Sequence, residues 1–368
     1  MTDQYAIDIT ACRARQQRLW NSQECSSLDS ILATRTETVQ WLTGAWVPPF
    51  FRSMAVLNRD GETVLVVPES CMSENFAADR VVSYPAQRLA TICDEQSELC
   101  GQALIETMDN LPQNVGTEAG TMSQHLADSW PATWKDVSET VLRLRRRKDP
   151  DEVVMLNRAN KANRRMYEHA RETLRPGINE LEVYNQLSAV ATTELGETPM
   201  YFGQDFQCCS MGGPPRNREA QTGELYILDL GVGFRGYRSD NCRTFCVGAE
   251  PDPKQQQAWE ILSSVFPLVE STVRPGVSCR DLYHQVNDML LAHTPWQFGH
   301  HLGHGVGLFG HEGPRLNPNY DDIFEEGNFF TVEPGLYHEE LRFGIRLEQN
   351  YLVTSNGVDL LTDWPLEL

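Results

Sequence analysis

Hydrophobic and polar residues alternate with helical spacing in some segments of this chain and with strand-like spacing in others. Near the N-terminus, a helical stretch around residues 13–21 precedes strand-like runs at residues 30–34, 53–57 and 63–67. A turn sequence, Asn58-Arg-Asp-Gly61, joins the last two runs. This order of helix and strands predicts an α/β unit in the N-terminal part of the chain.

A long amphipathic helix is predicted to follow this unit. Residues 151–174 carry hydrophobic side chains at steps of three or four, which form one stripe along a helix. The sequence Arg175-Pro-Gly177 ends this helix. We expect Asn179 to begin a second helix by accepting a hydrogen bond from the amide of Glu182.

The predicted domain boundary lies at Lys148-Asp149-Pro150, where proline and charge interrupt the hydrophobic pattern. We therefore expect two domains, residues 1–148 and residues 149–368. A basic run at Arg143 and residues 145–148 ends at this boundary. Because acidic residues follow it directly, we expect a solvated linker strand there and not a binding patch.

A hairpin is predicted between Glu224 and Asp240, where β-prone residues surround a glycine-rich centre. With Gly233 facing Gly236 across a two-residue turn, Asp229 and Asp240 become direct cross-strand neighbours on one face, about 5 Å apart at Cβ. Two carboxylates held this close repel one another unless a cation lies between them.

The same glycines match the dinucleotide fingerprint G-x-G-x-x-G over residues 231–236. That fingerprint requires a helix directly after it. Residues 237–247 are instead rich in β-forming side chains. We therefore expect these glycines to turn a hairpin and not to bind a nicotinamide cofactor.

A second hairpin repeats the arrangement, with Glu333 facing Glu348 and the chain reversing between Glu340 and Leu341. His304 lies among glycines that let the backbone approach a ligand closely. A lone acidic residue in a strand usually faces solvent, so the prediction depends on the joint spacing. Four carboxylates and one imidazole suit a pair of divalent ions such as Mn²⁺, Zn²⁺, Co²⁺ or Fe²⁺. The predicted metal ligands are Asp229, Asp240, His304, Glu333 and Glu348.

An internal repeat relates the two hairpins. Residues 174–178 (Leu-Arg-Pro-Gly-Ile) recur as residues 273–277 (Val-Arg-Pro-Gly-Val), an offset of 99 residues. Each copy follows a helical segment and precedes one acidic hairpin. We therefore expect an α+β domain made of a duplicated helix-helix-hairpin unit, whose pseudo-twofold arrangement brings the hairpins together around metal ions.

The composition of the chain argues against several classes of function. The 368 residues are 40% hydrophobic, with no apolar run long enough to span a membrane, so we expect a globular chain without membrane association. The formal net charge of −20 argues against nucleic acid as a partner. The first residues lack the features of a secretory signal, which favours the cytoplasm. The ten cysteines are expected to be reduced thiols.

With these motifs in place, the chain resembles the pita-bread metallopeptidase superfamily of aminopeptidase P, prolidase, methionine aminopeptidase and creatinase. Val39-Gln-Trp-Leu-Thr-Gly44 is similar to the smaller domain of creatinase and prolidase. The resemblance implies a C-terminal pita-bread catalytic domain and a smaller N-terminal α/β creatinase-like domain. The C-terminal motifs are Asp229-Leu-Gly231, Tyr237-Arg-Ser-Asp240, residues 303–308, residues 311–314, Val332-Glu-Pro-Gly335 and Ile345-Arg-Leu-Glu348.

The resemblance also implies an activity. It indicates a homodimeric hydrolase of the Xaa-Pro peptidase type, which cleaves a small peptide or peptide-like amide with two divalent metal ions, Mn²⁺ first among them. Asp229 would bind one ion, His304 and Glu333 the other, and Asp240 and Glu348 both. A hydroxide bridging the ions would be the nucleophile, with Glu333 placed to take its proton.

Further catalytic roles follow from the resemblance. His311 and His300 match substrate-side histidines, with the adjacent His301 as an alternative to His300. Arg346 would orient the second bridging glutamate. Each of these residues also has a structural interpretation, as a packing group or an ion-pair partner. Tyr337 either lines the pocket or fills core space.

One position departs from the family pattern. Active relatives carry a histidine shortly before the first metal aspartate, whereas residues 210–216 contain none. Two alternatives therefore stay open beside the Xaa-Pro peptidase. One is a hydrolase of non-peptide amides or amidines, as in relatives similar to creatinase or ectoine hydrolase, and the other is a pita-bread binding protein without catalysis.

Overall fold

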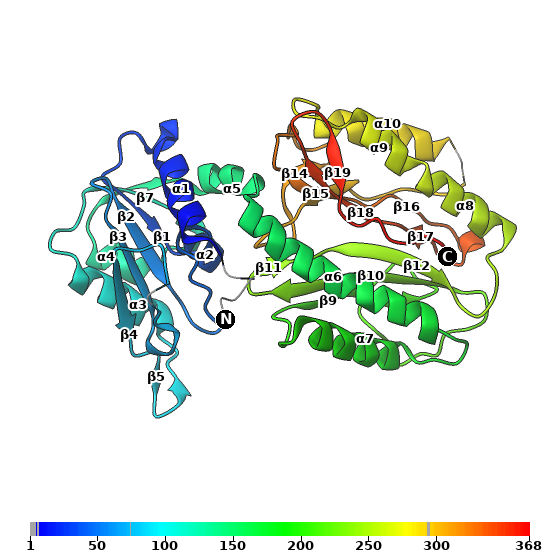
Figure 1. Ribbon diagram of the computed structural model, residues 1–368, viewed down its shortest axis with the longest axis horizontal. Coiled ribbons are helices and arrows are strands. Elements are labelled where there is room, and N and C mark those ends of the chain that lie inside the picture. The colour runs from blue at the N-terminus through cyan, green and yellow to red at the C-terminus, as the bar shows by residue number, and fades with distance from the viewer. Residues whose placement is uncertain (1–4, 6, 74, 293–294) are drawn as a thin grey trace. The chain divides into compact units, whose positions relative to one another are not determined.

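The chain folds into two compact units in the computed structural model, which describes residue 5 and residues 7–73, 75–292 and 295–368 (Figure 1). Unit 1 extends to Arg145, and unit 2 runs from Arg146 to Leu368. This division lies close to the boundary expected from the sequence. In the part of the chain that the structure describes, each helix is too short or too polar to cross a membrane.

Unit 1 is built on a mixed sheet with the strand order β4-β3-β2-β1-β7-β8. Helices α3 and α4 pack on one face, where Leu104 and Leu126 share a hydrophobic core with Val56 and Val64 of the sheet, and α1 and α2 lie on the other face (Figure 1). The predicted N-terminal helix and three strands are confirmed. The elements are α1 (Ile9–Trp20), β1 (Ser30–Ala33), α2 (Thr36–Thr43), β2 (Met54–Asn58), β3 (Thr63–Pro68), β4 (Arg80–Tyr84), β5 (Gln87–Arg88), β6 (Thr91–Ile92), α3 (Gln96–Thr107), β7 (Asn114–Thr117), α4 (Gln124–Ser129), β8 (Thr133–Asp136) and α5 (Ser138–Arg146).

The first half of unit 2 places two helices against a sheet in which β10 lies between β9 and β12 (Figure 1). The predicted stripe of the long helix is buried, from Met155 to Ala170, and packs toward this sheet. Asn179 begins the next helix as predicted, but its side chain accepts from the amide of Leu181 at 3.0 Å and not from that of Glu182. The elements are α6 (Pro150–Thr173), α7 (Glu180–Leu195), β9 (Phe202–Cys208), β10 (Leu225–Phe234), β11 (Tyr237–Arg238) and β12 (Asn241–Cys246).

The second half repeats this design with a sheet in the order β14-β13-β15-β18-β19 and three helices that share its core. Leu262, Val269 and Leu290 of the helices pack with Phe330 and Tyr351 of the sheet. The elements are α8 (Pro253–Ser263), α9 (Val265–Thr272), α10 (Cys279–Leu291), β13 (Gly303–Gly305), β14 (Glu312–Leu316), β15 (Phe329–Val332), β16 (Gly335–Leu336), β17 (Ile345–Arg346), β18 (Gln349–Val353) and β19 (Val358–Leu360).

The internal repeat is visible in the backbone. Gly177 and Gly276, which are related by the 99-residue offset, both have positive φ, at 84° and 93°. The amide of Gly177 donates to the carbonyl of Ala220, and the amide of Gly276 donates to that of Phe324. The two turns therefore connect helix to helix in the same way, which confirms the predicted duplication.

The two acidic hairpins differ in how well their registers were predicted. In the second hairpin, Phe329 pairs with Leu352 and Gly335 pairs with Arg346, which is the predicted register, and the chain reverses in a short helix at Glu339–Leu341. In the first hairpin the prediction is wrong by one residue on each strand, because Phe234 pairs with Tyr237.

The reason for this correction is the turn between β10 and β11. Its central residues are Arg235 and Gly236, with φ of 47° and 93°, the conformation that a tight hairpin turn requires at both positions. Asp229 is therefore paired with Cys242 and not with Asp240. Both aspartates still share one face, since side chains repeat every second residue along a strand. The glycines between residues 231 and 236 turn a hairpin, as predicted.

The expectation of a solvated linker strand at residues 143–148 is also wrong. The run up to Arg146 belongs to helix α5, and Arg146 pairs with Asp322 at 2.8 Å. Lys148 Nζ lies 2.8 Å from Glu312 Oε2, with both side chains buried. The acidic partners come from residues distant in sequence, so the local charge pattern did not reveal them.

Candidate metal centre

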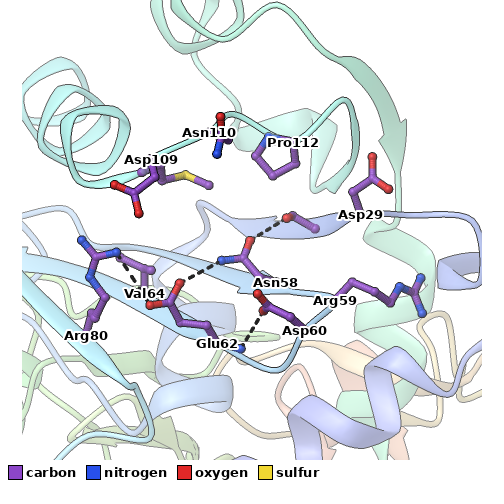
Figure 2. Close-up of a pocket in the computed structure, with 12 residues that line it drawn as sticks. Asp29, Asn58, Arg59, Asp60, Glu62, Val64, Arg80, Asp109, Asn110 and Pro112 are labelled. Carbon is purple, nitrogen blue, oxygen red and sulfur yellow. Dashed lines mark hydrogen bonds and ion pairs between the residues drawn. The ribbon is translucent and has the colours of Figure 1, made fainter.

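Unit 1 carries a polar surface pocket of about 570 Å³ (Figure 2). Its side chains largely satisfy one another, as Ser30 Oγ donates to Asn58 Oδ1 at 2.7 Å and Asn58 Nδ2 donates to Glu62 Oε2 at 3.4 Å. Among the described residues that line it there is no histidine or cysteine. We assign no catalytic role to this pocket, and the chemistry-bearing residues lie in unit 2.

The predicted metal ligands converge where the two halves of unit 2 meet. The amide of Glu348 donates to the carbonyl of Cys242 at 3.1 Å, and Asn241 Nδ2 donates to the carbonyl of Glu348 at 3.1 Å. These bonds join strand β12 of the first half to the segment between β17 and β18 of the second. All five predicted ligands are buried, with exposed fractions of 8% or less.

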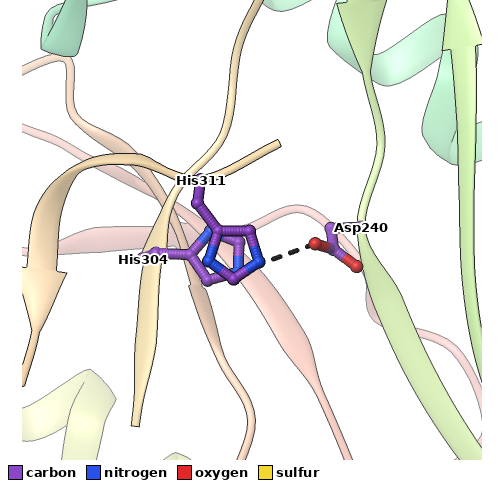
Figure 3. Close-up of side chains that lie close together, drawn as sticks. All are labelled: Asp240, His304 and His311. Atoms are coloured by element: carbon purple, nitrogen blue, oxygen red, sulfur yellow. Dashed lines mark ion pairs between the residues drawn. The ribbon is translucent and has the colours of Figure 1, made fainter. Parts of the chain in front are cut away.

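His304 faces two of the carboxylates. Its Nε2 lies 3.6 Å from Asp240 Oδ2 and 3.4 Å from Glu333 Oε1, and Figure 3 shows the contact with Asp240. Its Nδ1 lies 3.0 Å from the carbonyl oxygen of Gly305. Because a carbonyl can only accept, Nδ1 donates this bond, and Nε2 is the ring nitrogen that faces the carboxylates. Nε2 is therefore the nitrogen that could ligate a metal.

Burial makes ionisation of the clustered carboxylates costly. It raises the pKa of Asp229 to about 6, against which Arg346 acts in the opposite direction. The pKa values of Asp240 and Glu348 are also raised, first by burial and then by the charges of neighbouring acids. Glu333 differs: burial opposes its ionisation, but the hydrogen bond from His304 and the charges of nearby imidazoles lower its pKa to about 2.

The donor set fits divalent cations. Asp229 Oδ1 and both carboxylate oxygens of Glu348 are buried and have no hydrogen-bond partner within the described part of the chain. Asp229, Glu333 and Glu348 offer oxygens within 4.8 Å of one another, and Asp240, His304 and His311 form a second such group. Buried carboxylate oxygens without partners are costly unless a cation neutralises them, so the residues of this cluster could hold divalent cations.

His311 lies beside this cluster as the sequence suggested. Its ring stacks on that of His304, with centroids 3.7 Å apart and planes 13° apart (Figure 3). Burial and the charges of His304 and His301 lower its pKa to about 4, so the imidazole is neutral near pH 7. His311 as a whole remains exposed, which leaves it accessible to a substrate.

The ring of His300 is fixed by its own hydrogen bonds. Its Nδ1 donates to the carbonyl of His301 at 2.8 Å, so its Nε2 accepts from the hydroxyl of Tyr337 at 2.8 Å. The Tyr337 oxygen in turn accepts from Arg346 Nη1 at 3.3 Å. Tyr337 thus connects a histidine to the arginine of the site, and it is more than a core-filling residue.

Arg346 contacts a different acid from the one expected. Its Nη2 lies 2.9 Å from Asp229 Oδ2 and also contacts Asp205 Oδ2. The carboxylate of Glu348, which we expected Arg346 to orient, has no hydrogen-bond partner among the described residues. Arg346 therefore acts on the aspartate of the first hairpin.

Sequence reasoning missed two residues of the β9 strand and left His301 as an alternative. His301 Nδ1 lies 3.3 Å from Glu333 Oε1. Gln204 Nε2 donates to both carboxylate oxygens of Asp240, at 3.2 and 3.1 Å. Asp205 lies directly opposite Asp229. The adjacency of two histidines was a signal for His301, whereas β9 has no alternating pattern that would have revealed its pairing with β10.

Comparisons with known proteins agree with this architecture. The family model of metallopeptidase family M24 matches residues 155–355, and that of the creatinase/prolidase N-terminal domain matches residues 15–147. The Xaa-Pro dipeptidase of Pyrococcus horikoshii is 25% identical over 347 residues, which cover 93% of this chain and 95% of that protein.

Solved structures match over nearly the whole chain. The prolidase of Pyrococcus horikoshii superposes with a TM-score of 0.81 at 23% identity and covers 96% of this chain and 99% of its own. The Xaa-Pro dipeptidase of Bacillus anthracis superposes with a TM-score of 0.82 at 23% identity, covering 97% and 99%. The α+β pita-bread fold with a creatinase-like N-terminal domain is thereby confirmed, and the chain belongs to metallopeptidase family M24.

Proposed function

We propose that this protein is a dinuclear metal-dependent peptidase of the Xaa-Pro type, which cleaves small peptides. The observation that carries the proposal is that five possible ligand side chains are buried together. Three of their carboxylate oxygens, Asp229 Oδ1 and both of Glu348, have no hydrogen-bond partner among the described residues. Asp229 would hold one ion, His304 and Glu333 the other, and Asp240 and Glu348 both. Two divalent ions, when bound, make hydroxide available near neutral pH and polarise a carbonyl oxygen.

The protein's own side chains supply the remaining functions. Glu333, whose pKa is low despite burial, is a carboxylate near pH 7 and can accept the proton of the attacking water. His311 presents a neutral imidazole from the exposed side of the cluster, from which it can donate a hydrogen bond to a substrate oxygen. His301 and His300 line the Glu333 side of the site.

The test is an assay of Xaa-Pro dipeptides and tripeptides after loading with Mn²⁺, Co²⁺ or Zn²⁺. We expect hydrolysis of the Xaa-Pro bond, and the relative rates on dipeptides and tripeptides distinguish a dipeptidase from an aminopeptidase. Matched Xaa-Ala peptides serve as controls for proline specificity. Protein that contains metal but leaves every such peptide intact would contradict the proposal.

A second candidate function is hydrolysis of a non-peptide amide or amidine. It is favoured by the loop of residues 210–216, which contains no histidine and in which Gly212 lies against the carboxylate of Asp205. A group other than histidine on the substrate side of the site would suit a substrate other than an Xaa-Pro peptide. Turnover of creatine-like or cyclic amidine compounds, together with inactivity on Xaa-Pro peptides, would establish this alternative.

The preferred metal ion, the oligomeric state and the location in the cell stay predictions, and each can be measured directly. Mn²⁺ as the preferred ion is tested by elemental analysis of the purified protein and by activity after reloading. A homodimer is tested by light scattering coupled to size-exclusion chromatography. Location in the cytoplasm is tested by fractionation of the source cells.

A further inference from the structure

Asp205 lies next to the proposed metal centre and has no role in the mechanism proposed above. It lies on β9, the strand beside β10, and is the direct cross-strand partner of Asp229. Cross-strand partners in an antiparallel pair point to the same face of the sheet. Two carboxylates are thus held side by side, and a group of opposite charge is needed between them.

Arg346 supplies that charge. Its Nη2 contacts Asp205 Oδ2 and lies 2.9 Å from Asp229 Oδ2, so one nitrogen joins the two carboxylates. The side chain of Arg346 is 10% exposed, that of Asp205 21% and that of Asp229 9%. In such a water-poor setting, charge-assisted hydrogen bonds fix side-chain orientation strongly.

The other oxygen of Asp205 is fixed by a glycine loop. Oδ1 accepts from the amide of Gly213 at 2.7 Å. Gly212 and Gly213 have φ of 140° and 127°, and a Cβ on Gly212 would lie 2.2 Å from Asp205 Oδ2. Only glycine lets the backbone close on the carboxylate in this way. The loop thus restricts Asp205 to one orientation.

The contacts of Arg346 and Asp205 determine which oxygen of Asp229 is available to a cation. Oδ2 is occupied by Arg346, whereas Oδ1 is buried and has no partner among the described residues. Without Asp205, the guanidinium would keep its bonds to the carbonyl of Met211 and the Tyr337 hydroxyl, but Asp229 would be its sole carboxylate partner. Asp229 would then be held less rigidly, and Arg346 would compete more strongly with a cation for the Asp229 carboxylate.

We propose that Asp205 is a positioning residue for the metal centre: through Arg346 it orients Asp229 so that Oδ1 faces the cation. This inference rests on the proposed function, because it assumes that Asp229 binds a divalent ion. It assigns Asp205 no contact with the ion or with the substrate.

The test compares Mn²⁺ binding by calorimetry in the wild type, Asp205→Asn and Glu194→Gln. The Glu194–Arg158 pair is a matched control in the same unit, with side chains 18% and 10% exposed. Glu194 pairs with Arg158, Lys161 and Arg165, none of which is a predicted ligand. We expect Asp205→Asn to weaken one of two binding steps by about 10-fold to 100-fold, the usual effect of removing a residue that orients a ligand. Glu194→Gln should leave both steps unchanged.

A double-mutant cycle with Arg346→Lys separates positioning from general destabilisation. A lysine keeps the charge but has a single nitrogen on a flexible stem, so it cannot bridge two carboxylates in the same fixed geometry. If Asp205 acts through Arg346, the double variant should bind Mn²⁺ no more weakly than Arg346→Lys alone. Additive losses in the cycle would overturn the inference.

The remaining outcomes are distinguishable. Wild-type protein that binds no divalent ion would refute the proposed function itself. Wild-type protein that binds two ions, with Asp205→Asn binding them equally well, would leave the proposed function standing and refute the role of Asp205. A fall in melting temperature alone, matched by Glu194→Gln, would show that Asp205 is merely structural.

Discussion

At the scale of single residues, the metal centre consists of acids whose surroundings disfavour their charge. Burial raises the pKa of Asp229, Asp240 and Glu348, whereas His304 keeps that of Glu333 low. The sequence predicted which acids would gather, because carboxylate spacing within a hairpin is a local property. It did not predict Asp205 or the contact of Arg346 with Asp229, since those partners come from separate strands.

The raised pKa of Asp229 leads to a prediction about the metal-free protein. An acid with a raised pKa holds its proton more tightly when folded, so its stabilising contribution is present below about pH 4 and is lost as pH rises through about 6. In chelator, we expect Asp229→Asn to unfold at a higher temperature than the wild type at pH 7.5. Because the pKa of this carboxyl is raised, we expect a difference in unfolding free energy on the order of 1–3 kcal/mol.

The difference should disappear near pH 4, where the wild-type carboxyl is protonated in the folded state. Thermal unfolding of both proteins in buffer with chelator, from pH 4 to pH 8, measures it. A wild type that is more stable than Asp229→Asn throughout this range would show that Asp229 is satisfied by Arg346 without a cation.

A second prediction at this scale concerns Glu333. Replacement with glutamine removes the proton acceptor and one anionic ligand, so we expect kcat on Xaa-Pro peptides to fall by about 10²-fold to 10⁴-fold. Steady-state kinetics at saturating Mn²⁺ measures this loss, and elemental analysis reports how much metal remains. An active Glu333→Gln enzyme would place the proton transfer on another residue.

At the scale of elements, strand register determines which side chains meet. The predicted turn of the first hairpin was shifted by one residue on each strand, yet Asp229 and Asp240 still face the same side. This is because the error moved both strands together and preserved the two-residue repeat. The register of the second hairpin, which carries Glu333 and Glu348, was predicted correctly. The connection between its strands is longer and polar, so it imposes no particular tight turn.

The short strand β13 gives a prediction about close backbone packing beside His304. A Cβ on Gly303 would lie 2.0 Å from the carbonyl oxygen of Thr331, whereas a Cβ on Gly299 would meet nothing within 4 Å. We expect Gly303→Ala to destabilise the protein by about 1–3 kcal/mol or more through overpacking, and Gly299→Ala to have little effect. Equal melting temperatures for the two variants would contradict the close approach of β13 and β15.

At the scale of the whole molecule, each half of unit 2 supplies only part of the donor set. Asp229 and Asp240 come from the first half, and His304, Glu333 and Glu348 come from the second. The amide of Glu348 donates to the carbonyl of Cys242, and the Asn241 side chain donates to the carbonyl of Glu348, which holds the halves together where these side chains meet. Divalent ions bound there would connect the two halves and stabilise unit 2.

We therefore predict that Mn²⁺ raises the melting temperature. At a free concentration 100 times the dissociation constant, a ligand that binds only the folded state adds about 2.7 kcal/mol, which corresponds to about 5–10 °C for a unit of this size. Differential scanning fluorimetry during Mn²⁺ titration measures the shift, and chelator should reverse it. The same shift in an Asp240→Asn, Glu348→Gln double variant would mean that Mn²⁺ binds elsewhere.

The sequence by itself predicted the fold class, the duplication and the five side chains that gather between the two halves, whose role as metal ligands stays a prediction. Each is encoded in local periodicity: hydrophobic steps make helices, glycine-rich turns make hairpins, and a 99-residue repeat makes two similar halves. These signals depend on residues near one another along the chain.

Only the tertiary structure decided which groups surround the ligands. His301 approaches Glu333, Gln204 binds Asp240, and Asp205 shares Arg346 with Asp229. Each of these contacts joins segments that are far apart in sequence, and pairing between distant strands is set by how the whole unit packs. The physical reason is that charge and hydrogen bonding in a buried site depend on every element that closes it, whereas a sequence pattern records only one element at a time.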